Sequence, residues 1–229
     1  MPYGVIVDSL AVLMGGLIGG FAGERISKSL KVELPVVFGF AAISMGVLKI
    51  TETNNLTLVI LSLILGSILG SLMQIERSLE KGAKFILGKV KGFNEDEDRY
   101  QELFVLGLIA FCVSGTGIFG ALREGFIADS SILLSKSVLD FFTAMIFASI
   151  VGYSISLISI PQFIILSLFF YAAHLIAPYL STTVLGNFSA VGGIITLMMG
   201  FKMANIAKSK AANAIPALLI VVVLSLIFL

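Results

Sequence analysis

The sequence has a single cysteine, Cys112, and a single histidine, His174. One cysteine excludes a disulfide within the chain and any metal site built from several cysteines. One histidine excludes an HExxH motif and a cluster of histidine ligands. We therefore expect neither a metal site nor any other bound cofactor.

The motifs of soluble enzymes are also missing. No GxSxG sequence, P-loop or dinucleotide-binding fingerprint stands in a soluble context. An intramembrane protease would need paired aspartates or a Ser–His pair at mid-membrane depth, and we expect Asp8 and Asp140 to be shallower. The chain is therefore expected not to be an enzyme. Because it has no soluble nucleotide-binding domain, any transport is expected to be secondary or channel-like.

Charged residues are scarce, at 13% of the chain, whereas soluble domains have about 25%. Hydrophobic residues make up 58%, and the mean hydropathy is +1.06. Apolar runs approach the roughly 20 residues that a membrane-spanning helix needs. These features predict an all-α, polytopic integral membrane protein that is surrounded by lipid. The net charge of +1 gives no indication of a nucleic-acid partner.

The apolar runs predict about eight spans, of which the second and the last are short. They lie near residues 4–22, 35–50, 56–74, 104–122, 137–157, 162–178, 187–203 and 214–229. No basic segment precedes the first run and no clear cleavage site follows it, so we expect a permanent helix rather than a signal peptide. The spans are expected to form one membrane domain, with helical groups at 1–74 and 104–229.

The distribution of Lys and Arg predicts the orientation. The connections after the first, third, fifth and seventh spans hold twelve of the fifteen basic residues, and the other side holds Lys49, Arg123 and Lys136. The basic side is expected to be cytoplasmic, which places both termini outside. Between the helical groups, the connector 75–103 predicts an amphipathic helix over 75–93 whose lysines lie on the cytoplasmic lipid surface.

Two pairs of segments indicate a weak internal repeat, as many transporters have. The segment at 15–30 is similar to that at 66–82, and the segment at 43–49 is similar to that at 197–202.

Small residues also recur at four-residue spacing in the first, third, fifth and seventh spans, including Gly15, Gly19 and Gly23 in the first. Such stripes allow close helix packing. We predict a core of these four spans joined by the fourth, with the sixth and eighth outside. The stripes either pack within the chain or, in the first span, form a homo-oligomer contact.

The fourth span contains the run FCVSGTGIFGALREG, in which Ser114, Gly115, Thr116 and Gly117 interrupt the apolar residues. Such residues are tolerated in a membrane where they line an interface or a water-filled cavity. They either break the span into two half-helices, whose ends would bind ions or polar solutes, or pack tightly without a break.

Ionisable residues inside spans are candidates for function. Asp8, Asp140 and His174 each lie about one turn from a predicted span end, which also permits simple interfacial solvation. The two carboxylates would make a cation or proton site, or Lys136 would neutralise Asp140 as an i,i+4 pair.

The seventh span opens with the polar run NFSAVGG. Its residues Asn187, Ser189, Gly192 and Gly193 would either present backbone amides to an anion or serve as a cap and packing glycines.

The ordered segments FCVSGTGIFGALREG, LLSKSVLDFFTAMIFAS, SAVGGI and NAIPALL resemble the prokaryotic membrane family called domain of unknown function 554. The opening GVIVDSLAVLMGGLIGG is similar to the first helix of that family. The resemblance covers nearly the whole chain and implies a location in the inner membrane of a prokaryote. It implies a transporter in general terms and supplies no substrate.

Two functions are therefore expected as alternatives. The first is a secondary transporter or channel for a small ion or polar solute. A polar cavity between Asp140, Ser114 and Ser189 would distinguish it. The second is a membrane scaffold that binds lipid or a partner through the basic helix at 75–93, which would have a dry, filled core.

Overall fold

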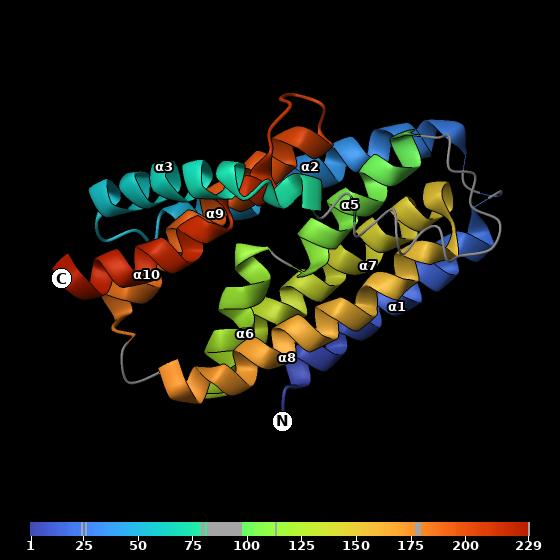
Figure 1. Cartoon of the computed structure of the whole chain (residues 1–229). Coiled ribbons are helices and arrows are strands. Elements are labelled where there is room, and N and C mark those ends of the chain that lie inside the picture. The colour runs from blue at the N-terminus through green and yellow to red at the C-terminus, as the bar shows by residue number, and fades with distance from the viewer. Residues whose placement is uncertain are drawn as a thin grey trace.

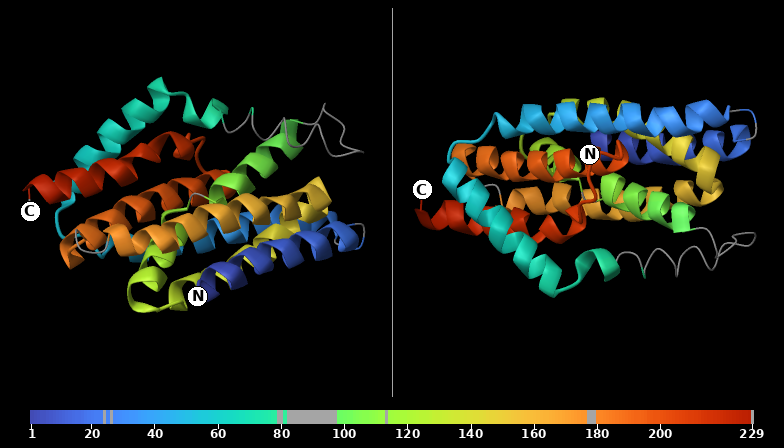
Figure 2. Two further views of the ribbon diagram at one scale, coloured as in Figure 1. Left: turned by 60° about the horizontal axis from the view of Figure 1, so that its bottom comes forward. Right: turned by 90° about the horizontal axis from the view of Figure 1, so that it is seen from above.

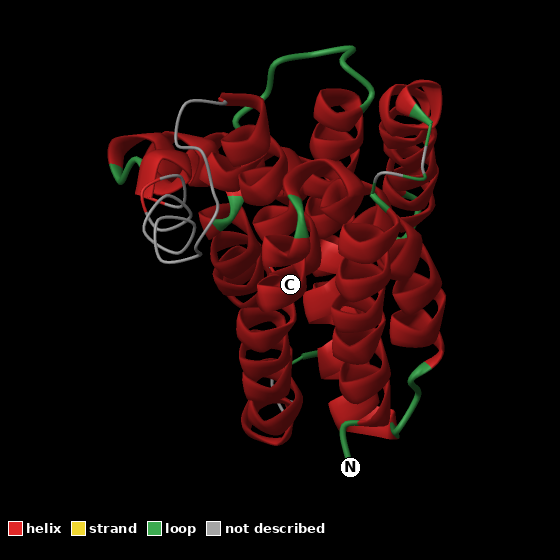
Figure 3. Ribbon diagram, turned by 90° about the vertical axis from the view of Figure 1, so that its right-hand side faces the viewer, coloured by secondary structure: helices red, strands yellow, loops and turns green. Residues whose placement is uncertain are grey.

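The computed structural model describes residues 1–23, 25, 27–78, 81, 98–112, 114–176 and 180–228. Helices account for almost all of this part of the chain, and it contains no strand (Figures 1 and 3). The helices are α1 (Tyr3–Ala22), α2 (Lys28–Ile50), α3 (Leu56–Leu72), α5 (Asp98–Cys112), α6 (Gly115–Ile127), α7 (Ser131–Val151), η1 (Tyr153–Ile158), α8 (Ser159–Ile176), α9 (Thr182–Met203), η3 (Ala211–Ala214) and α10 (Pro216–Phe228).

The helices confirm the all-α, polytopic membrane class. Within the described residues, seven helical stretches are long and apolar enough to cross a membrane, and α3 is a shorter apolar helix of 17 residues. Some predicted boundaries were wrong. The second span is not short, since α2 has 23 residues and continues through Pro35. The fifth begins at Ser131, six residues before the predicted start.

Helices that are distant in sequence pack in pairs. The largest contacts join α1 to α7, α2 to α9, α6 to α8 and α3 to α10. Figure 2 shows α1 lying beside α7 and α2 beside α9. The glycine contacts show the direction of each pair: α1 and α6 run parallel to their partners, and α2 and α3 run antiparallel to theirs. A chain that crosses the membrane eight times in succession requires these same directions.

The glycine stripe of α1 fits against the backbone of α7. A Cβ atom added at Gly15 would collide with the carbonyl of Phe141, and one at Gly19 would collide with the carbonyl of Met145. Gly23 faces Ser149 in the same way, at 3.2 Å from its carbonyl oxygen. This stripe packs within the chain, as one of the two interpretations predicted, so α7 already occupies the face that an oligomer contact would use.

Glycines make the contact between α2 and α9 on both helices. A Cβ at Gly46 would lie 2.6 Å from the carbonyl oxygen of Gly193, and one at Gly39 would lie 2.7 Å from that of Gly200. The similar segments 43–49 and 197–202 thus include facing parts of one antiparallel pair.

The prediction that the odd-numbered spans form the core was wrong in two respects. Helix α3 packs chiefly on α10 and η3 rather than with α1 and α7. Helix α8 is not peripheral, because Gln162 and Leu166 are completely buried. Gly152 ends α7 with a φ of +87°.

The fourth span is broken, which confirms one of the two interpretations. Helix α5 ends at Cys112, and α6 begins at Gly115. Ser114 has extended backbone angles, and its Oγ accepts a hydrogen bond from the N–H of Gly117 at 3.1 Å. A serine cap of this kind satisfies a free backbone donor at a helix start. The sequence SGTG therefore makes two half-helices.

The connector is described only in part. Residues 75–78 are helical, whereas most of the predicted amphipathic helix at 75–93 lies outside the described residues. Glu76 is nearly buried, and its carboxylate pairs with Lys202 at the end of α9, 3.0 Å away. Asn213 accepts a hydrogen bond from the Glu76 N–H through Oδ1. The beginning of the connector is therefore tied to α9 and η3.

Candidate ion site beside the broken helix

Four buried side chains from three helices form a polar cluster: Asp8 of α1, Lys136 and Asp140 of α7, and Gln162 of α8. The Lys136 ammonium is 3.0 Å from Asp8 Oδ2 and also pairs with Asp140 Oδ2. The Gln162 Nε2 donates to the same two oxygens, at 2.8 Å to Asp8 and 3.3 Å to Asp140. Two nitrogen donors thus hold one oxygen of each carboxylate.

The packing of α1 on α7 brings these residues together. Lys136 and Asp140 are one turn apart on α7, so their side chains lie on the same face. The parallel glycine contact sets the register in which Asp8 meets both. Asp140 was expected about one turn into its span. Because α7 begins at Ser131, Asp140 lies near the middle of that helix, about 13 Å from its start at 1.5 Å per residue.

The cluster is almost completely shielded from solvent. Asp8 and Gln162 are 0% exposed, Lys136 is 2% exposed and Asp140 is 5% exposed. Two oxygens in it have no hydrogen-bond partner among the described residues, namely Asp8 Oδ1 and Gln162 Oε1. A buried acceptor without a donor costs about 1–3 kcal/mol. The hydrogen bonding of the cluster is therefore incomplete at these two atoms.

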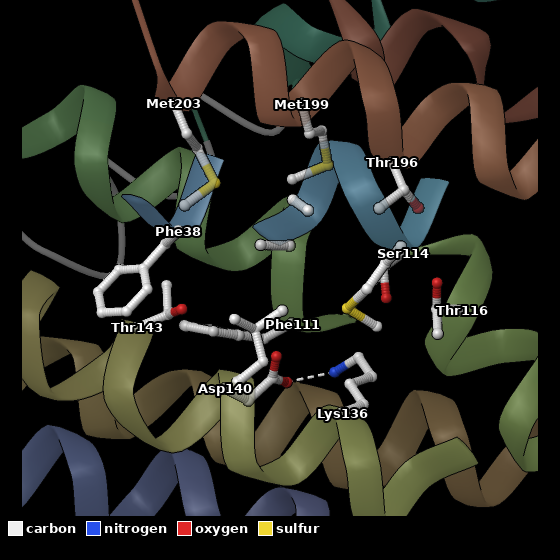
Figure 4. Close-up of a pocket in the computed structure, with 14 residues that line it drawn as sticks. Phe38, Phe111, Ser114, Thr116, Lys136, Asp140, Thr143, Thr196, Met199 and Met203 are labelled. Carbon is white, nitrogen blue, oxygen red and sulfur yellow. Dashed lines mark hydrogen bonds and ion pairs between the residues drawn. The ribbon is translucent and has the colours of Figure 1, made fainter. Parts of the chain in front are cut away.

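A central cavity of about 50 Å³ lies on one side of the cluster. Figure 4 shows Lys136 and Asp140 below it and Ser114 and Thr116 beside it, with Thr196 of α9 opposite. A water molecule needs roughly 10–15 Å³ by this measure, so the cavity has room for a few waters or a small ion. Much of the remaining lining is apolar, including Phe38, Phe111 and Met199.

The start of α6 contributes to the cavity. Ser114 and Thr116 both line it, and both are buried. The Thr116 Oγ1 has no hydrogen-bond partner among the described residues. A helix N-terminus carries about half a positive charge. The break therefore places polar groups and a helix dipole beside Lys136 and Asp140.

Helix α6 also fixes the beginning of α1. The Glu124 carboxylate accepts the N–H of Gly4 at 2.6 Å and that of Val5 at 3.3 Å. Pro2, at the cap position of α1, has no side chain that could do this. An acidic group at a helix N-terminus is favourable and satisfies free donors. Glu124 thus anchors α1 one turn before Asp8.

The turn between α6 and α7 is fixed by Asp129. Its carboxylate accepts hydrogen bonds from the Ser131 N–H at 3.0 Å and from Arg123 Nε at 2.8 Å. Hydrogen bonds from Ser131, followed by the interaction with Arg123, lower the pKa of Asp129 to about 2. Asp129 is therefore ionised at neutral pH and holds the first residue of α7, five residues before Lys136.

The structure brings together some of the candidate residues and separates others. Asp8, Lys136 and Asp140 meet in the polar cluster, and Ser114 and Thr116 line the cavity beside it. Gly115 and Gly117 form the first turn of α6. The lysine interacts with both candidate carboxylates, so the i,i+4 pair forms and the two carboxylates also lie together, while an ion site made by them stays a prediction.

The candidates of the seventh span lie away from the cluster. Asn187 Oδ1 accepts the N–H groups of Asn54 at 3.0 Å and Asn55 at 2.8 Å, and its Nδ2 donates to Ser225. Gly193 packs against Gly46.

Two further candidates of the seventh span, Gly192 and Ser189, are buried in α9 outside the cavity lining, and the Ser189 Oγ has no partner among the described residues. His174 lies in α8, and its side chain is not among those described.

Sequence analysis missed Gln162 and Glu124. The sixth span was expected to begin at Gln162 and to face lipid, although an amide in the otherwise apolar run SIPQFIILSLFFY was a signal of a buried polar contact. In the sequence, Glu124 was considered only as part of the run FCVSGTGIFGALREG, and its role as the cap of α1 was not predicted. Among the described residues, no group of three or more His, Cys, Asp or Glu side chains could hold a metal ion.

Comparisons with known proteins identify a family and two relatives that match almost the whole chain. The family described as "Protein of unknown function (DUF554)" matches residues 3–226. The uncharacterized protein YqgA of Escherichia coli (strain K12) is 36% identical over 231 residues, covering 98% of this chain and 97% of YqgA. The uncharacterized membrane protein YdfK of Bacillus subtilis (strain 168) is 26% identical over 222 residues, covering 95% and 93%. No solved structure matches the chain.

Proposed function

The chain belongs to the DUF554 family of membrane proteins of unknown function, and we propose that it is a secondary transporter or channel for a small ion or polar solute. The observation that carries this proposal is the broken fourth span, which opens onto a central cavity beside a buried set of charged groups. The proposal involves no catalytic step.

The energetic argument starts from the cost of charge in a membrane. Asp, Lys and similar residues are rare inside spans and usually serve ion pathways, proton relays or counter-ions. Here three such residues meet inside the protein, with Asp140 about 13 Å along α7 from its start, and no surface water solvates them. Apolar side chains of similar size would pack there without this cost, so function is the better explanation for their presence.

The break in the fourth span supports the same conclusion. Unwound backbone at membrane depth is tolerated where it is buried in protein or lines a cavity, and many transporters bind solutes at the ends of such half-helices. The first turn of α6 meets both conditions, because Ser114 and Thr116 are buried and line the cavity. We propose that the solute passes between this turn, Asp140 and α9.

The orientation and assembly belong to this proposal as well. We propose that the protein lies in the inner membrane of a prokaryote with both termini outside, because twelve of its fifteen basic residues lie on the other side. Homo-oligomers remain part of the proposal, and the exposed apolar side chains of α3 such as Leu65 and Ile68 offer a face for them.

Flux through reconstituted liposomes tests the function. The purified full chain is reconstituted, and the movement of protons, alkali cations, halides and small polar solutes is measured with fluorescent or isotopic tracers. We expect at least one of them to move faster than in empty liposomes. Asp140→Asn should reduce that flux at least about tenfold, since it removes one charge of the buried pair.

The matched control is Glu33→Gln, which removes an exposed carboxylate on α2 and should leave the flux unchanged. Both variants are first checked for a monodisperse elution profile, so that loss of folding is not mistaken for loss of transport. Wild-type protein that moves none of these solutes, or Asp140→Asn that transports normally, would contradict the proposal.

A further inference from the structure

The charges of the polar cluster do not balance. Among the described residues, the ion pairs of Asp8 and Asp140 are both made with Lys136. With two carboxylates and one ammonium in their usual ionised forms, the cluster carries a net charge of −1. Such a charge is costly when it is buried, and groups in this position are neutralised or paired.

Among the described residues, no side chain of the surrounding helices supplies the missing positive charge, and the N-terminus of α6 offers only the partial charge of its dipole. Helix α8 contributes neutral Gln162, and α6 contributes Glu124, whose carboxylate is bound to the first turn of α1. Helix α5 contributes the thiol of Cys112, which interacts electrostatically with Asp8, Lys136 and Asp140. The remaining titratable groups that face the cluster are therefore acidic or neutral.

The unpartnered atoms show where the missing positive charge belongs. Asp8 Oδ1 and Gln162 Oε1 both lie on residues that are 0% exposed, and neither has a donor among the described residues. Gln162 points into the cluster, since its Nε2 is bonded to both carboxylates. Both orphaned atoms are acceptors, so a group that brings a hydrogen or a positive charge would complete the site.

The geometry favours a proton over a metal cation. A hard cation such as Mg²⁺ or Ca²⁺ takes six or more oxygen ligands. Two fully buried oxygens of the cluster lack a partner among the described residues, and Oδ2 of each carboxylate already contacts the Lys136 ammonium, which would repel a second cation. A proton needs a single oxygen and no shell of ligands.

We propose that the Asp8–Asp140 carboxylate pair of the polar cluster binds one exchangeable proton and that H⁺ is an ion which this protein moves. The second clause rests on the transport function proposed above, whereas the first does not. The proton adds to one carboxylate of the pair and gives a neutral carboxylic acid. The Lys136 ammonium then remains with the other carboxylate, and the cluster has no net charge.

The proton enters and leaves the cluster through Asp140. The central cavity is lined by Asp140 and Lys136, whereas Asp8 and Gln162 lie outside its lining. The proton therefore moves between Asp8 and Asp140, whose Oδ2 atoms share the same two nitrogen donors. Asp140 then exchanges it with water in the cavity. Each transfer breaks one O–H bond and forms another, so no further reactant is needed.

Infrared spectroscopy detects this proton without any transport. The full chain in lipid nanodiscs at neutral pH should show the carbonyl stretch of a protonated carboxyl group, shifted by D₂O and by carbon-13 in the aspartate side chains. Asp8→Asn keeps the shape of the side chain and leaves one carboxylate, Asp140, beside the Lys136 ammonium, so the cluster is neutral without the proton and the band should disappear. Glu33→Gln, on the exposed face of α2, should retain it.

Each outcome decides the assignment. The absence of the band from wild-type protein, its insensitivity to aspartate labelling or its persistence in folded Asp8→Asn would overturn the proton site. The labelled wild-type spectrum decides the question even if Asp8→Asn does not fold.

The result also separates the two proposals. A band that behaves as expected in a protein without any flux would contradict the transport function and support the proton site. Flux of another solute without the band would support the transport function and contradict the proton site. If both proposals hold, a pH-sensitive dye trapped in liposomes should report proton movement that Asp8→Asn reduces at least about tenfold.

Discussion

At the scale of single residues, Glu124 shows how the chain satisfies a helix end that has no local cap. The first N–H groups of a helix have no partner within the helix, and leaving them unpaired in a membrane is costly. Pro2 offers no side chain for them, and α1 instead uses a carboxylate about 120 positions later in the sequence. This contact fixes the helix that carries Asp8.

Replacing Glu124 should therefore destabilise the protein. Glu124→Ala removes two hydrogen bonds to a charged group, each worth about 1.5–3 kcal/mol, and leaves two buried N–H groups unpaired. We expect the free energy of unfolding in detergent, measured by chemical denaturation, to fall by about 3–6 kcal/mol. Arg123→Ala is the control, since its pair with Asp129 is partly exposed, and exposed ion pairs contribute little to stability. Equal destabilisation by both variants would contradict this role of Glu124.

The sequence predicted those residues of the site whose immediate neighbours in the chain already mark them as unusual. Lys136 and Asp140 stand four residues apart in an apolar span, and the run SGTG is unusual enough to indicate a break. Gln162 and Glu124 were missed because their partners lie on other helices, and a single sequence does not show which helices meet. The depth of Asp140 was also missed, because the polar residues SSILLSKS resemble a loop, although they begin α7.

At the scale of helices, the stripe on α1 shows how closely two backbones can approach. Gly15, Gly19 and Gly23 face positions 126 residues later in α7, a constant offset that only a parallel pair can keep. In lipid, where apolar burial adds little, such close contact supplies much of the attraction between helices. The stripe was predicted from spacing alone, whereas its partner helix was not.

Gly19→Ala tests this contact. The new methyl group would collide with the main-chain carbonyl of Met145, which cannot move without shifting α7. We expect the free energy of unfolding to fall by about 2 kcal/mol or more, as overpacking does. Gly107→Ala in α5 is the control, since its methyl would meet side-chain atoms at 3.2 Å or more, and it gains helix propensity. Denaturation curves in detergent compare the variants, and equal stability would contradict the contact.

At the scale of the whole molecule, the two predicted helical groups are interleaved. The helices of the first group pack mainly on helices of the second: α1 on α7, α2 on α9 and α3 on α10. The division at the connector is therefore visible in the sequence as a change of composition, but contacts across it join the two halves. Eight spans could be counted from hydropathy, whereas this pairing depends on long-range packing that hydropathy does not report.

Separating the halves should show this dependence. Fragments 1–78 and 98–229 are expressed alone and together, with the intact chain as the control. We expect each fragment alone to be degraded by protease, because its main packing partners are missing, and the co-expressed pair to copurify as a resistant complex. Limited proteolysis and affinity copurification provide the measurements. A protease-resistant 1–78 fragment would show instead that the first group folds independently.

The single cysteine has a practical consequence for experiments. Cys112 is the last residue of α5, is 1% exposed, and its Sγ lies 3.9 Å from the carbonyl oxygen of Ile158. A maleimide can reach this thiol only when the packing around Cys112 opens. The wild-type chain therefore carries its own reporter, and the rate at which it is alkylated measures how often the interior opens.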